Sequence, residues 1–150
     1  MNNTDKQYTY AQYKVKLSKA LRHGFWLEAV FIEYAMIEDR TESVLRHEGT
    51  IKLTNKQGHP LKLSIKLNKI HDSAPFTDKQ IRKRIPLSFI DEIWTWKDRR
   101  DAYIHSLMKN PYCEEDAREI AEEGNEIVRQ LDNKVKSVNR IFDKKTQAAI

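Results

Sequence analysis

The most restrictive feature of the sequence is a run of small and apolar residues at helical spacing in its last third. Successive members are mostly three or four residues apart, which places them on one face of an α-helix. Acidic residues begin the segment at Glu114, and it ends at Lys144 and Lys145, an order that the helix dipole favours. The pattern predicts one long amphipathic helix over about residues 114–144. Its apolar face comprises Ala117, Ile120, Ala121, Gly124, Ile127, Val128, Leu131, Val135, Val138 and Ile141.

The rest of the chain also has the pattern of amphipathic helices. It contains only four Gly and four Pro among 150 residues, too few for the turns of a β-sandwich or barrel. Helical spacing predicts three further long helices over about residues 9–22, 25–47 and 88–109, and a short one over 77–84. The predicted fold class is therefore all-α: an antiparallel up-and-down four-helix bundle in a single domain of residues 1–150.

The middle of the chain differs from the rest in charge. Residues 46–86 contain ten Lys or Arg and three Asp or Glu, whereas the remainder contains 17 and 19. We treat residues 48–86 as a basic helical insertion, which indicates either a polyanionic partner or a solvated surface. A helix beginning at Pro60 is favoured there, because a single strand would have no partner. Residues 145–150 are expected to form a loose tail.

Several features restrict location and chemistry. The single cysteine cannot form an internal disulfide, and no apolar run is long enough to span a membrane. We therefore expect a cytoplasmic protein without membrane attachment. The sequence has no Gly-rich phosphate loop or dinucleotide fingerprint, and its five histidines lack metal-ligand spacing. No metal or other cofactor is predicted.

Charged residues occur at positions where the helical pattern predicts apolar ones. Glu33 and Arg40 lie within the apolar stripe of the second helix, seven residues apart, and so need partners from elsewhere. They are predicted to be supporting polar residues, either in a seam between helices or near a functional site. In the helix over 88–109, Asp101 and His105 are four residues apart, so the carboxylate is placed to orient the imidazole.

The segment Arg100-Asp101-Ala-Tyr-Ile-His105 resembles the Arg-(Asn/Asp/His)-x3-His form of the Arg-x4–6-His motif of the HEPN superfamily. Those proteins are all-helical domains of prokaryotic toxins, abortive-infection systems and RNA-guided nucleases. The opening helix, the long second helix with Glu33 and the basic insertion also resemble the family's layout. Ser106 stands where a glycine commonly follows the family's histidine.

The resemblance implies a metal-independent endoribonuclease that acts as a homodimer, with two motifs facing each other across the interface. His105 would then be the general acid or base for attack of the ribose 2′-OH on the adjacent phosphate. Arg100 would hold the phosphate, and Asp101 would position one or both side chains. RNA, a second copy and an antitoxin protein are the partners that the resemblance suggests, with no cofactor.

Further cations are candidate nucleic-acid contacts. Lys97 and Arg99 lie beside the motif, and Arg82, Lys83 and Arg84 lie in the basic insertion, where they would guide the strand. Two other interpretations remain. In the first, the chain is a non-catalytic module that binds RNA, a nucleotide or another protein. Arg100 would then be ion-paired with the acidic stretch 114–126, and His105 would be a core residue. Alternatively, the chain would be another helical interaction protein or hold a metal.

Overall fold

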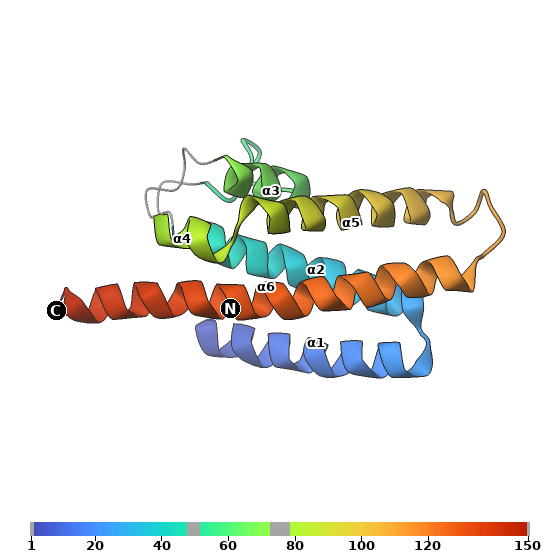
Figure 1. The fold of residues 1–150 in the computed structure, drawn as a ribbon, viewed down its shortest axis with the longest axis horizontal. Coiled ribbons are helices and arrows are strands. Elements are labelled where there is room, and N and C mark those ends of the chain that lie inside the picture. The colour runs from blue at the N-terminus through green and yellow to red at the C-terminus, as the bar shows by residue number, and fades with distance from the viewer. Residues whose placement is uncertain (1, 48–51, 73–78, 150) are drawn as a thin grey trace. The chain divides into compact units, whose positions relative to one another are not determined.

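The computed structural model describes residues 2–47, 52–72 and 79–149 (Figure 1). Within these ranges the regular secondary structure consists of six α-helices, and an isolated antiparallel bridge pairs Thr54 with Pro60 without forming a strand. The predicted all-α fold class is therefore confirmed. The helices are α1 (Asn3–His23), α2 (Trp26–Arg46), α3 (Leu63–His71), α4 (Lys79–Arg84), α5 (Leu87–Ser106) and α6 (Glu114–Ala148).

Local capping explains where α1 begins and ends. The side chain of Asn2 accepts a hydrogen bond from the backbone N–H of Asp5 at 2.8 Å, which starts the helix earlier than residue 9, where the apolar pattern begins. Tyr8 is 67% exposed, so the first turns give no apolar signal. Gly24 has φ of 72°, and its N–H bonds the carbonyl groups of Ala20 and Leu21 to end the helix.

The basic insertion is partly described, with residues 48–51 and 73–78 outside the described ranges. The expected helix after Pro60 is α3, which begins at Leu63. Of the helix predicted over 77–84, the described part is α4. At the other end of the chain, α6 extends to Ala148, so residues 145–148 of the expected loose tail are helical and exposed.

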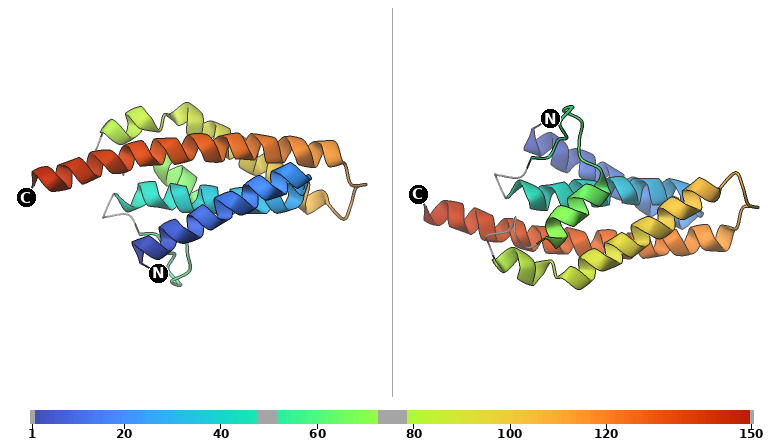
Figure 2. Two further views of the ribbon diagram at one scale, coloured as in Figure 1. Left: turned by 90° about the horizontal axis from the view of Figure 1, so that it is seen from below. Right: turned by 90° about the horizontal axis from the view of Figure 1, so that it is seen from above.

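The chain divides into two compact units, and α2, α5 and α6 each contribute residues to both. Figure 2 shows these helices from below and from above the view of Figure 1. The first unit combines Met1–Ile37 with Trp96–Val128. In it, the indole Nε1 of Trp96 in α5 donates a 2.9 Å hydrogen bond to the carbonyl of Ile120 in α6. Its buried apolar residues are Leu17, Ala20, Ala29, Val30, Ile32, Met36, Ile37, Trp96, Ala117, Ile120, Ala121, Ile127 and Val128.

The second unit combines Glu38–Thr95 with Arg129–Ile150 and includes the basic insertion. The insertion contributes to the core of this unit, since Leu61, Leu63, Leu67, Ile70, Ile81 and Ile85 are all buried. Lys66 on α3 is only 1% exposed, and its Nζ lies 3.1 Å from Glu38 and 3.5 Å from Glu42 of α2. A buried ammonium needs such partners, so this cluster fixes α3 against α2.

Among the described residues, no helix combines the length and the apolar character needed to cross a lipid bilayer.

Candidate functional site

The residues of the predicted motif lie in the last turns of α5, where Asp101 joins two cations. One carboxylate oxygen accepts a hydrogen bond from Lys97 Nζ, and the other accepts one from Arg100 Nη1, each at 2.8 Å. Burial alone would raise the pKa of Asp101, but the hydrogen bonds and charges of Lys97 and Arg100 hold it below its ordinary value. Asp101 is therefore an anion that fixes both cationic side chains at neutral pH.

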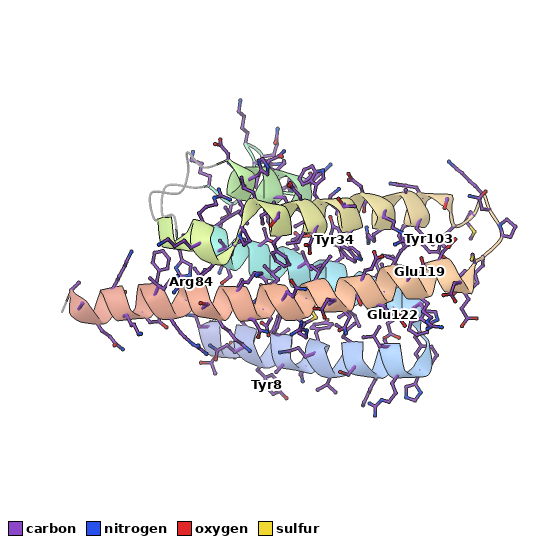
Figure 3. All side chains as sticks on the ribbon, viewed as in Figure 1. Tyr8, Tyr34, Arg84, Tyr103, Glu119 and Glu122 are labelled. Atoms are coloured by element: carbon purple, nitrogen blue, oxygen red, sulfur yellow. The ribbon has the colours of Figure 1, made fainter. Side chains whose placement is uncertain are left out.

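Arg100 is held from its other side by aromatic rings of α2. Its guanidinium carbon lies 4.2 Å from the ring centroid of Tyr34 and 5.3 Å from that of Phe31. Figure 3 labels Tyr34 beside α5. The Arg100 side chain is 13% exposed, and its Nε is buried without a hydrogen-bond partner in the part of the chain that the structure describes. A guanidinium held between a carboxylate and aromatic rings is an oriented cation, since these contacts restrict the side chain while its charge is kept.

His105 is exposed and lies one turn after Asp101. The expected Asp101–imidazole hydrogen bond is not formed; the two carboxylate oxygens of Asp101 bind Lys97 and Arg100. Within the described part of the chain, no hydrogen bond or ion pair engages the His105 side chain. Arg100 and His105 are five residues apart, a rotation of about 140° around a helix axis, so a single helix directs them to different sides.

Arg99, next to the motif, forms a structural link. Its two terminal nitrogens each lie 2.7 Å from a carboxylate of α6, one from Glu119, which Figure 3 labels, and the other from Glu123. The hydrogen bond to Glu119, together with the charge of both carboxylates, raises the pKa of Arg99. The acidic stretch that was considered as a partner for Arg100 therefore pairs with Arg99.

Lys97 is also engaged by acidic side chains. Besides Asp101, its Nζ lies 3.7 Å from Asp98. Burial alone would lower the pKa of Lys97, but the hydrogen bond from Lys97 to Asp101 and the surrounding charges raise it above its ordinary value. Lys97 thus remains a cation that shares Asp101 with Arg100.

The three basic residues of the insertion differ in their surroundings and belong to the second unit. Arg82 donates a 2.7 Å hydrogen bond from Nη2 to the carbonyl of Ile70, at the end of α3. Arg84, which Figure 3 labels, donates from Nε to the Ser137 hydroxyl at 2.8 Å. Lys83 is exposed. The sequence analysis grouped the three as cations that would guide an RNA strand. In the structure, two of them, Arg82 and Arg84, form hydrogen bonds within the protein.

Glu33 is buried in the first unit with an uncommon environment. Its side chain is 0% exposed, and neither carboxylate oxygen has a hydrogen-bond partner among the described residues. Burial raises the pKa of Glu33 to about 10, so the group is a neutral acid at physiological pH. A Cβ at Gly124 would collide with this carboxyl group and lie 2.8 Å from Cζ2 of Trp96, so the glycine makes room for both side chains.

The sequence placed Gly124 on the apolar face of the long helix without a role. A glycine in the middle of an otherwise regular apolar face is a sign that another group packs closely there, and this was the feature from which the role of Gly124 could have been predicted. Arg40, the second supporting polar residue, belongs to the second unit and donates a 3.1 Å hydrogen bond from Nε to the neighbouring Asp39.

The surface of the first unit has a small pocket at the connection between α5 and α6, of about 80 Å³. Tyr103, which Figure 3 labels, lines this pocket, and its hydroxyl donates to the Cys113 carbonyl at 3.3 Å. Ligand pockets are commonly about 300–1,000 Å³, so this one is too small for a nucleotide. Among the described residues, no group of three or more His, Cys, Asp or Glu side chains is arranged to hold a metal ion.

Comparison of the chain with protein-family models, with curated proteins and with solved structures finds no match in any of the three.

Proposed function

We propose that this protein is a HEPN-like, metal-independent endoribonuclease that uses Arg100 and His105 across a homodimer. The observation that supports it most is the end of α5. There the partly buried Arg100 is oriented by Asp101 and Tyr34, and the exposed His105 follows five residues later. An oriented guanidinium binds a phosphodiester, and an exposed imidazole is available to transfer a proton.

The chemistry follows from these two groups. The imidazole of His105 takes the proton of a ribose 2′-OH, and the resulting oxygen attacks the adjacent phosphorus. The bond from phosphorus to the 5′-oxygen breaks, and that oxygen takes up a proton, from an imidazolium or from water. The products are a 2′,3′-cyclic phosphate and a free 5′-hydroxyl. Arg100 stabilises the charge that develops on the phosphoryl oxygens. DNA has no 2′-OH and is not cut.

The rotation between Arg100 and His105 favours a site built from two copies. A helix directs side chains five residues apart to different sides, so His105 of one copy and Arg100 of the other are better placed to meet at one phosphate. The proposal also includes an antiparallel four-helix bundle fold, a cytoplasmic location, and a toxin–antitoxin or phage-defence setting with an antitoxin partner.

The test is cleavage of labelled RNA by the purified protein in excess EDTA. We expect cleavage that ends in 2′,3′-cyclic phosphate and is lost in His105→Ala. The matched control is His59→Ala, which removes an exposed imidazole from the second unit. Equal cleavage by the parent and His105→Ala, or the same cleavage of DNA, contradicts the proposal.

A non-catalytic RNA-binding module is the second candidate. Exposed Lys83 and the cations beside Asp101 support RNA binding without requiring chemistry. RNA affinity that falls with salt and survives His105→Ala, without cleavage by the parent, favours this candidate.

A further inference from the structure

The surface beside Arg100 carries an exposed aromatic ring. Phe31 of α2 is 52% exposed, and the Arg100 guanidinium carbon lies 5.3 Å from its ring centroid. Phe31 precedes Tyr34 by one helical turn, so both rings lie on the same side of α2 and both contact the same guanidinium. Tyr34 is the more enclosed ring and Phe31 the more open one. A cation and an accessible ring therefore lie side by side.

This pair matches the two chemical parts of a nucleotide. A phosphodiester is an anion that a guanidinium binds, and a base is a flat ring that stacks on an aromatic side chain. In a single strand the two parts belong to one residue and lie within a few ångströms of each other. In a duplex the base faces are covered by neighbouring bases, and a protein reaches them only by unstacking the base.

We propose that Phe31 stacks on an unpaired base of single-stranded RNA whose phosphate is bound by Arg100. The protein then selects single strands and loops over duplex RNA. This inference rests on the proposed function, because it places RNA at Arg100.

The charges around Phe31 favour RNA over a protein as its occupant. The centre of a protein–protein interface is enriched in aromatic residues and arginine but depleted of lysine and of acidic residues. Phe31 contacts Arg100, which belongs to a charged cluster with Asp101 and Lys97. The dimer proposed above does not require that a second copy cover this ring, so burial of Phe31 against another chain is a separate outcome that an experiment detects.

The experiment measures binding of a short fluorescent single-stranded RNA to the His105→Ala protein, in which cleavage is removed. Loss of one stacked base lowers affinity by about five- to hundredfold, which is the effect expected for Phe31→Ala. Phe31→Trp keeps a stacking ring and is expected to retain affinity. Phe25→Ala is the matched control, since Phe25 is a similarly exposed ring of the first unit, at 57%. The duplex of the same sequence is expected to bind weakly.

A second measurement assigns the effect to stacking. The same strand is prepared with one abasic ribonucleotide at successive positions. At one position the missing base is expected to weaken binding to the protein with Phe31, and to have little further effect on Phe31→Ala. Such non-additivity identifies the base and the ring as partners.

The outcomes separate this inference from the proposed function. Equal affinity of Phe31→Ala and its parent, or equal binding of duplex and single strand, overturns the inference and leaves the ribonuclease proposal standing. Absence of RNA binding and of cleavage in the unmodified protein overturns both. Conversion of dimer to monomer by Phe31→Ala, seen by sedimentation, assigns the ring to a protein interface and overturns the inference.

Discussion

At the scale of single residues, Glu33 is the group whose chemistry departs furthest from that of the isolated amino acid. Its carboxyl group is fully enclosed, lies against Gly124, and has no hydrogen-bond partner within residues 2–47, 52–72 and 79–149. Burial raises its pKa from the ordinary 4.5 to about 10. The protonated form is the more stable one in the folded protein, because an unpaired carboxylate in a protein interior is strongly disfavoured.

This pKa predicts a pH-dependent stability. Above pH 4.5 the unfolded chain ionises Glu33 while the folded protein keeps the proton until about pH 10. Folding therefore takes up a proton, and this group lowers stability by up to about 1.4 kcal/mol per pH unit as the pH rises through that interval. Glu33→Gln carries no such proton. We expect its urea unfolding midpoint to fall less with pH than that of the parent and to exceed it at alkaline pH.

The control for this measurement is Glu28→Gln, which changes an exposed carboxylate on the same helix. Its midpoint is expected to follow the parent at each pH. A Glu33→Gln protein with the same pH dependence as the parent contradicts a buried neutral acid at this position.

At the scale of helices, α3 is attached to α2 by a charge rather than by apolar contacts alone. Position 66 shares a helix face with Leu63, Leu67 and Ile70, which are all buried, and carries a lysine. The ammonium is accommodated because Glu38 and Glu42 reach it from α2 with partly exposed carboxylates. Burial of this lysine could have been predicted from the residue spacing, since Lys66 falls on the apolar face of the short helix.

The pairing can be tested by removing its anionic side. Glu38→Gln with Glu42→Gln leaves the Lys66 ammonium buried without a counter-charge, and we expect a loss of about 3–5 kcal/mol in the free energy of unfolding. Adding Lys66→Met to this double variant removes the unpaired charge and is expected to restore most of the loss. Urea unfolding measures both. Glu92→Gln, an exposed change on α5, is the control, and failure of Lys66→Met to rescue contradicts the interpretation.

At the scale of the whole molecule, the proposed site requires two chains. Mixing inactive Arg100→Ala and inactive His105→Ala proteins allows mixed dimers in which one of the two sites has both groups. Random reassociation makes half of the dimers mixed, so we expect about a quarter of the parent activity to return. Cleavage of labelled RNA before and after subunit exchange checks this. The unmixed variants are the controls, and no recovery despite proven exchange contradicts a composite site.

Most of the helices could be predicted from the sequence, because each helix buries one face. The buried residues therefore recur in the sequence every three or four positions. The apolar spacing of residues 114–144 corresponds to α6, and that of residues 25–47 to α2. Boundaries were less accurate where a cap rather than burial decides them, as at Asn2, or where exposed turns continue a helix, as at residues 145–148. The single-domain organisation and the bundle topology stay predictions.

For the candidate site, the sequence determined which residues stand in the motif and which positions violate the apolar pattern. It identified Glu33 and Asp101, because charge on an otherwise apolar helix face is visible in a one-dimensional pattern, and the spacing of the motif singled out Arg100 and His105. Only the tertiary structure decided their partners. Asp101 binds Lys97 and Arg100 rather than His105, Arg99 rather than Arg100 reaches the acidic helix, and Glu33 lies against Gly124. Such pairings depend on distances of a few ångströms between helices, which residue spacing along one helix does not contain.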